Sequence, residues 1–143
     1  MIEYTVKAYA KSNDWFLNGE RHREDGPAIE WAHGSKEWYL NGKRHREDGP
    51  AVDRPSGFKV WYLNGMVHRE DGPAMEFVNG AKEWYLNGEL HREDGPAIEY
   101  LDGTKEWYLN DKCLAEEEHR QQTQSCAGKI VEIDGKKYKL TEV

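Results

Sequence analysis

The residues best suited to chemistry stand in a hexapeptide, His-Arg-Glu-Asp-Gly-Pro, which occurs at residues 22–27, 45–50, 68–73 and 91–96. A histidine, an arginine and two carboxylates side by side could in principle hold a metal ion, bind an anion or form ion pairs. We expect no metal site, because His-x-Glu without further converging ligands is a poor donor set. Asp-Gly-Pro is typical of turns, and the alternating charges favour a ladder of ion pairs along the chain.

The same hexapeptides support a second hypothesis, in which they bind an anion. If neighbouring repeats or subunits bring the His-Arg pairs together, these rows would capture a nucleotide-like small molecule, and the protein would act as a sponge for it. The candidate anion-binding residues are His22, Arg23, His45, Arg46, His68, Arg69, His91 and Arg92.

We predict no enzyme activity and no catalytic residue. A catalytic site needs different groups in fixed roles within an asymmetric pocket, whereas any candidate set here recurs four times in near-identical surroundings. No glycine-rich phosphate loop precedes a helix pattern, no nucleophile motif occurs, and nothing in the sequence indicates a cofactor.

The hexapeptides belong to a longer repeat that organises the chain. Tryptophan recurs every 23 residues, at Trp15, Trp38, Trp61, Trp84 and Trp107. Each unit carries two short strand patterns, as in residues 36–40 and 50–54, and each pattern is followed by a glycine-containing turn such as Asn41-Gly42 or His33-Gly34. Tight turns between short strands predict a mainly β fold, an elongated antiparallel meander of 23-residue double-hairpin repeats.

Alternation along the strands predicts which side chains share a face of the sheet. We expect one apolar face, with Trp38 and Leu40 beside Ile29 and Trp31, and a second face with Glu37 and Tyr39 beside Ala28 and Glu30. The Trp and Leu columns are predicted to form most of the core, and part of them stays open as a groove if the sheet curls.

The second face carries a stripe of carboxylates and tyrosines, which is either a solvated surface or a binding surface. Tyrosine offers contact area at low entropic cost, and the carboxylates favour a protein partner with a basic surface. The candidate partner-binding residues are Glu30, Glu37, Tyr39, Tyr62, Glu76, Glu83, Tyr85, Glu99, Glu106 and Tyr108.

Both ends of the array differ from the repeats. Residues 1–14 read as an N-terminal half-repeat that caps the array at 15–110 and adds its first strand. Residues 111–143 read as a separate segment, with a helix over 113–125 capped by Asp111 and a hairpin over 129–140 turning at Asp134-Gly135. This segment is expected to cap the last strand, to bind a partner or to form a homodimer.

Composition limits the classes of partner. The chain has 143 residues, a net charge of −7 and a mean hydropathy of −1.00, which argues against direct nucleic-acid binding and against docking on anionic lipid. No apolar run could cross a membrane, and no signal-like stretch stands at the N-terminus. Cys113 and Cys126 fit no metal or disulfide pattern, so we expect free thiols and a cytoplasmic location.

The 23-residue step, the aromatic-x-Leu-Asn-Gly opening and the paired glycines resemble MORN repeats. The chain looks most similar to divergent MORN-like arrays of the Trp-Tyr-Leu-Asn-Gly…His-Arg-Glu-Asp-Gly-Pro-Ala type, which bacteriophages and large DNA viruses encode. It departs from the standard family pattern, since a single glycine precedes Pro-Ala where MORN units usually carry Gly-x-Gly.

The resemblance covers roughly residues 6–110 and implies scaffolding or phospholipid contact at the family level. For a phage-encoded member it implies an inhibitor of a host nuclease or defence factor, acting in the host cytoplasm. A structural scaffold or virion component is the further alternative.

Overall fold

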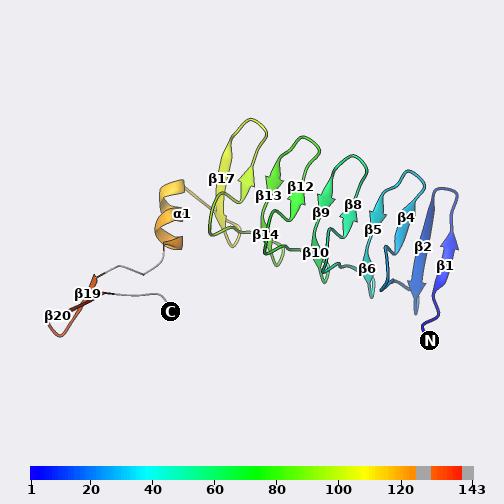
Figure 1. Cartoon of the computed structure of the whole chain (residues 1–143), viewed down its shortest axis with the longest axis horizontal. Helices are drawn as coiled ribbons and strands as arrows, with labels where there is room; N and C mark the ends of the chain where they lie inside the picture. The colour runs from blue at the N-terminus through cyan, green and yellow to red at the C-terminus, as the bar shows by residue number, and fades with distance from the viewer. Residues whose placement is uncertain (125–129, 140–143) are drawn as a thin grey trace.

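The computed structural model describes residues 1–124 and 130–139. One long antiparallel meander is followed along the chain by a short helix and a separate two-stranded hairpin (Figure 1). The central sheet has 12 strands. They are β1 (Thr5–Ala8), β2 (Ser12–Leu17), β3 (Glu20–Arg21), β4 (Ile29–Trp31), β5 (Lys36–Glu37), β8 (Val52–Asp53), β9 (Lys59–Val60), β12 (Met75–Glu76), β13 (Lys82–Glu83), β16 (Ile98–Glu99), β17 (Lys105–Leu109) and β18 (Lys112–Leu114). The predicted fold class is confirmed.

Each internal repeat also sends a second hairpin off the central sheet. The Asn41-Gly42 and Asn64-Gly65 turns have positive φ at both residues, between 50° and 82°, which is the type I′ geometry that matches the twist of paired strands. The tight turns predicted at the Asn-Gly steps are therefore confirmed. The paired strands are β6 (Tyr39–Leu40) with β7 (Lys43–Arg44), β10 (Tyr62–Leu63) with β11 (Met66–Val67), and β14 (Tyr85–Leu86) with β15 (Glu89–Leu90).

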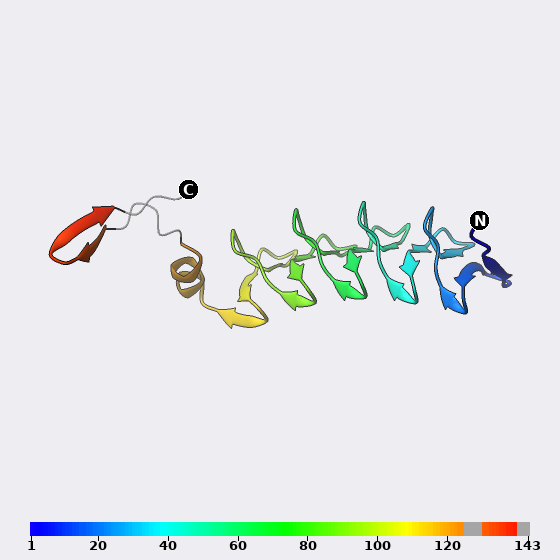
Figure 2. The same cartoon turned by 90° about the horizontal axis from the view of Figure 1, so that it is seen from below.

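The single strand predicted over residues 36–40 is wrong, because the chain changes partners at Trp38. The first two residues pair within the central sheet, whereas the last two pair with β7. At the junction, the Trp38 N–H donates to the Ala51 carbonyl (2.8 Å), and the Trp38 carbonyl accepts from the His45 N–H (3.1 Å). The three internal repeats are bent in this way (Figure 2), whereas β2 and β17 continue through Trp15 and Trp107 as single strands.

The loop between β4 and β5 differs from the tight turn that His33-Gly34 suggested. It holds three residues between Trp31 and Ser35, which are joined by a 3.0 Å backbone hydrogen bond, and only Gly34 has a positive φ (97°). With three residues in the loop instead of two, the pairing register of the two strands shifts by one residue. A shift of one residue moves every side chain of one strand to the opposite face of the sheet.

The predicted sorting of the two faces is therefore wrong. Ile29 lies opposite Glu37 on the same face, and Glu30 lies opposite Lys36 on the other. The same pairing recurs in the last repeat, where Ile98 lies opposite Glu106. The glutamates of the predicted stripe are thus divided between the two faces of the sheet.

The core is built from small and branched aliphatic residues rather than from tryptophan. The alanine that follows each hexapeptide has no exposed surface, and the next residue is buried in three of the four repeats. All five repeat tryptophans and their Leu partners are half-buried, so the prediction that they form most of the core is wrong. The buried apolar residues are Ala28, Ile29, Ala51, Val52, Val60, Ala74, Ala81, Ala97, Ile98 and Leu114.

The ends of the array follow the prediction in part. Residues 5–8 form β1, the first strand, as expected. At the other end, Asn110 and Asp111 both have positive φ (48° and 63°) and make a fifth hairpin turn, which leads into β18. Asp111 is therefore not the helix cap, and the predicted boundary between residues 110 and 111 falls inside this turn.

The helix α1 (Glu116–Thr123) is shorter than the predicted 113–125, and its N-cap position is Ala115. It packs against β17 and β18, and its buried His119 donates from Nε2 to the Arg92 carbonyl. The helix thus covers the last repeat, in agreement with the prediction of a lid.

The predicted C-terminal hairpin is present as β19 (Ile130–Ile133) and β20 (Lys136–Lys139), with positive φ at Asp134 and Gly135. Cys113 is an exposed free thiol in β18 rather than a helical residue, whereas Cys126 lies outside the described residues. The homodimer contact proposed for residues 111–143 stays a prediction.

Candidate functional site

Each hexapeptide forms a loop that is held by its arginine. The Arg46 guanidinium lies over the Trp38 ring at 3.9 Å, donates from Nε to Asp48 (2.9 Å) and donates from Nη1 to the Pro50 carbonyl (3.1 Å). Cation–π stacking and charge-assisted hydrogen bonds of this kind are strong for their size. The same arrangement recurs with Arg23 on Trp15, Arg69 on Trp61 and Arg92 on Trp84, at 3.9–4.2 Å.

The glycine of each loop makes room for that guanidinium. A Cβ atom placed on Gly49 would lie 2.9 Å from Arg46 Cζ, and the corresponding distances at the other three loops are 2.8–3.0 Å. None of these four glycines has a positive φ. Close packing against the guanidinium, rather than backbone conformation, favours glycine here, a role that the turn-like Asp-Gly-Pro pattern did not indicate.

The loop histidines join successive repeats. His45 Nδ1 accepts from the Asn64 N–H at 3.0 Å, at the hairpin turn of the next repeat. The pairs His22–Asn41, His68–Asn87 and His91–Asn110 repeat this bond at 2.9–3.1 Å. Because Nδ1 accepts, the neutral imidazole carries its proton on Nε2. In each loop this Nε2 lies 3.6 Å from Oε1 of the glutamate two residues after the histidine.

We therefore expect His68→Ala to lower the free energy of unfolding by about 0.5–1.5 kcal/mol, because the Asn87 N–H loses its bond to the imidazole. Urea denaturation followed by tryptophan fluorescence measures this change. His33→Ala is the matched control, since His33 is exposed and lies beside Trp31 and Ser35 of its own repeat, and it should change stability by less than about 0.5 kcal/mol. Equal effects of the two substitutions would contradict the joining role.

The acidic residues of the loops project into solvent. Their side chains are 61–86 % exposed, while those of the loop arginines are 21–24 % exposed. Each loop therefore presents carboxylates outward and keeps its cation against tryptophan. These carboxylates are Glu24, Asp25, Glu47, Asp48, Glu70, Asp71, Glu93 and Asp94.

The hydrogen bond from Arg46, together with its charge, lowers the pKa of Asp48 below its usual 3.8, and Arg69 and Arg92 do the same for Asp71 and Asp94. A lowered folded-state pKa gives stability that is present above the unfolded value and is lost as the pH falls through the folded value.

We expect the stability difference between the wild type and Asp48→Asn to be constant above about pH 5 and to shrink below about pH 4. Urea denaturation at pH 7, 4 and 3 measures it. A difference that stays constant down to pH 3 would contradict the Arg46–Asp48 pairing.

Most side chains of the predicted Glu–Tyr stripe form hydrogen bonds or ion pairs within the protein. Glu37 is 6 % exposed; it accepts from the Tyr39 hydroxyl (2.9 Å) and from Arg44 (3.1 Å). The hydroxyls of Tyr85 and Tyr108 donate in the same way to the glutamates two residues before them, at 2.9 and 3.0 Å. Burial and the adjacent carboxylate raise the pKa of Tyr39 above its usual 10.0.

The remaining glutamates of that list lie on the opposite face. Glu30, Glu76 and Glu99 each contact the arginine of the preceding loop, at 3.3, 3.5 and 3.1 Å. Tyr62 has valine two residues before it and is half-buried. The structure therefore does not bring the ten predicted residues together as one exposed surface. The strand register and the bend at tryptophan, which the alternation pattern did not predict, separate them.

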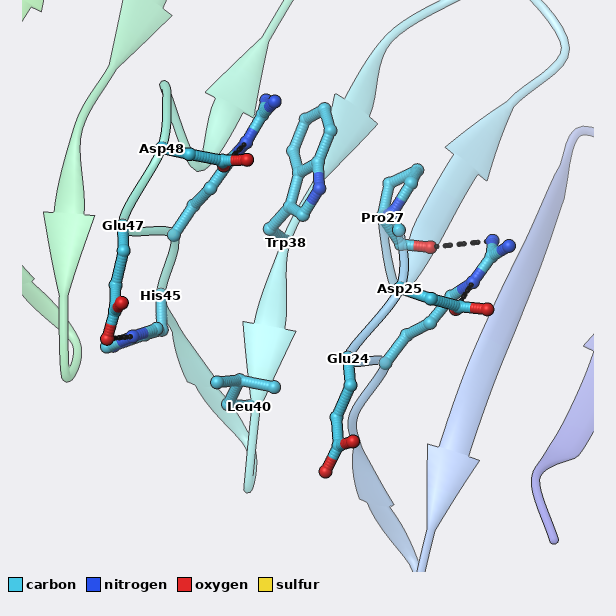
Figure 3. Close-up of a pocket in the computed structure, with 11 residues that line it drawn as sticks. Glu24, Asp25, Pro27, Trp38, Leu40, His45, Glu47 and Asp48 are labelled. Atoms are coloured by element: carbon cyan, nitrogen blue, oxygen red, sulfur yellow. Dashed lines mark hydrogen bonds and ion pairs between the residues drawn. The ribbon is translucent and has the colours of Figure 1, made fainter. Parts of the chain in front are cut away.

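Grooves lie between successive loops, and they repeat along the array. The first groove, with a volume of about 760 Å³, lies between loops 22–27 and 45–50. Figure 3 shows Trp38 and Leu40 between the two loops, with Glu24 and Asp25 from one loop and Glu47 and Asp48 from the next. A second groove of about 690 Å³ stands on Trp61 and Leu63, and a third of about 610 Å³ stands on Trp84 and Leu86.

The grooves combine an apolar floor with acidic walls, which is the chemistry of a site for a cationic or aromatic group. The arginines predicted to bind an anion line the same grooves, but each is already bonded to a carboxylate and a carbonyl. Within residues 1–124 and 130–139, no group of three or more His, Cys, Asp or Glu side chains is placed to hold a metal ion.

Comparisons with protein-family models, with curated proteins and with solved structures find no match to this chain. The MORN-like resemblance and the bacteriophage source that it implies therefore stay predictions. Among the helices that the structure describes, none has the length and apolar character of a membrane span.

Proposed function

We propose that this protein is a non-catalytic binding protein that engages a partner with a basic surface through its loops. The observation that carries the proposal is the row of exposed loop carboxylates. It consists of four glutamates and of four aspartates that pair with the arginines turned inward against tryptophan. Rows of one charge sign on a regular scaffold speed association with a partner of opposite charge and select against others.

The repetition of the loops favours binding over catalysis. Four loops present the same residues in the same geometry, with Arg–Trp distances that agree within 0.3 Å. Such an array gives several equivalent contacts to one extended surface, whereas an enzyme needs one asymmetric set of groups. The grooves are open troughs between these loops.

On the MORN-like resemblance we further propose that the partner is a host nuclease or defence factor whose basic surface normally meets nucleic acid. The exposed carboxylates would compete for that surface in the cytoplasm of the host cell. The proposed contact with the basic partner is therefore made by the loop carboxylates and no longer by the Glu–Tyr stripe.

Calorimetric titration with a lysine decapeptide tests the proposal. The triple variant Glu47→Gln, Glu70→Gln, Glu93→Gln should bind about tenfold more weakly than the wild type in 50 mM NaCl, because three rim charges are lost. The matched control is Glu20→Gln, Glu89→Gln, Glu118→Gln, which removes three exposed charges elsewhere and has the same net charge.

The control variant should keep the wild-type affinity, and raising the salt to 500 mM should weaken binding by the wild type. If both triple variants lose affinity equally, only the net charge matters, and the assignment to the loops is wrong. If the wild type does not bind the peptide at all, the proposed function is wrong.

A further inference from the structure

Tyr4, near the N-terminus, packs against the first loop, residues 22–27. The Tyr4 ring stacks on the His22 ring, with centroids 6.3 Å apart and planes 27° from parallel. The Tyr4 hydroxyl accepts a hydrogen bond from the Glu24 N–H at 3.3 Å. An aromatic ring with a hydroxyl group is therefore held between a loop histidine and a loop amide.

Within residues 1–124, the other three loops have the same histidine and amide but no ring stacked on the histidine. His45, His68 and His91 line the three grooves beside the tryptophan floors. In the part of the chain that the structure describes, no acceptor bonds the N–H of Glu47, Glu70 or Glu93. The side chains of these glutamates are 77–85 % exposed, compared with 61 % for Glu24.

The spacing of the grooves restricts the backbone that could reach all three. Each repeat adds two strands to the central sheet, so equivalent loops recur about every 9.5 Å. Every third residue of a polyproline II helix points the same way, at a step of about 9.3 Å. Same-face residues of a β-strand recur about every 6.7 Å, which does not match.

We propose that the three grooves bind tyrosine side chains at every third position of a polyproline II segment in the basic partner. Each ring lies on a groove histidine in the way that Tyr4 lies on His22, and its hydroxyl accepts from the free loop amide. Lysine or arginine residues between the tyrosines face the loop carboxylates. This inference rests on the proposed function, since it names the segment of the basic partner that the loops recognise.

Two capped nonapeptides of equal charge, (Tyr-Pro-Lys)3 and (Ala-Pro-Lys)3, test the proposal by calorimetry. The tyrosine peptide should bind at least about tenfold more tightly, because aromatic stacking adds to the shared charge term. Equal affinities would overturn the inference and leave the proposed function standing. If neither nonapeptide binds, the inference is wrong, and the titration with the lysine decapeptide decides the proposed function separately.

Amide chemical shifts locate the bound rings. On addition of (Tyr-Pro-Lys)3, the amide signals of Glu47, Glu70 and Glu93 should shift more than that of Glu24, because the Glu24 N–H already bonds the Tyr4 hydroxyl and Glu24 only lines the wall of the first groove. In the Tyr4→Ala variant the Glu24 signal should shift as well. A Glu24 amide that shifts as much as the other three in the wild type, or that shifts no further in Tyr4→Ala, would contradict the equivalence of the four positions.

Discussion

Replacing Gly49 by alanine is expected to destabilise the protein by about 1–2 kcal/mol. The new Cβ atom would lie 2.9 Å from Arg46 Cζ, so the end of the arginine side chain must shift, which weakens its stacking on the Trp38 ring and its bonds to Asp48 and Pro50. Overpacking costs about 1–3 kcal/mol, and a hydrogen bond to a charged group contributes about 1.5–3 kcal/mol. Urea denaturation followed by tryptophan fluorescence measures the loss.

The effect of Gly49→Ala on the free energy of unfolding should change sign when Arg46 is absent. Gly49 does not have a positive φ, so alanine fits the backbone and restricts the unfolded chain, which stabilises by about 0.4–1 kcal/mol. In an Arg46→Ala background, Gly49→Ala is therefore expected to be neutral or stabilising. A cost that is equal in both backgrounds would show that the glycine serves the backbone and not the packing of the guanidinium.

Replacing His119 by alanine is the second large change, with an expected cost of about 2–3 kcal/mol. The side chain is 3 % exposed and donates to the Arg92 carbonyl, so the variant leaves a cavity and an unpaired acceptor. In a repeat array each unit depends on its neighbours. The loss should therefore appear first as faster hydrogen exchange in β17, β18 and α1, with β2 to β5 unchanged.

Arg120→Ala is the matched control for the helix. Its ion pairs with Glu116 and Glu117 join side chains that are each more than half exposed, and such pairs contribute at most about 1 kcal/mol. Uniform acceleration of exchange across all repeats in His119→Ala, or an effect no larger than that of Arg120→Ala, would mean that the helix does not cap the array.

The sequence was sufficient to predict the meander because the 23-residue period carries its own turn signals. Asn-Gly at each hairpin defines two consecutive positive φ values, and the structure has them. The register was missed because His33-Gly34 resembles a two-residue turn, although only its glycine adopts a positive φ. A difference of one loop residue moved Ile29 to the face of Glu37.

The loops could be predicted only as turns with ion pairs. Their arginines do pair with the nearby aspartates, but the stacking of Arg46 on Trp38 joins residues eight apart across a bend that the alternation pattern does not encode. The grooves depend on this stacking, because it turns the cation inward and leaves the carboxylates outside. Only the structure could therefore move the proposed contact from the Glu–Tyr stripe to the loops.

Zero-length carbodiimide cross-linking of the lysine decapeptide to the wild-type protein, read by mass spectrometry, tests the central claim most directly. Amide bonds between peptide lysines and loop carboxylates, above all those of Glu47, Glu70 and Glu93, are the expected products. Cross-links concentrated on Glu20, Glu89 and Glu118, or on Glu83 and Glu106 of the former stripe, would contradict a binding surface made by the loops.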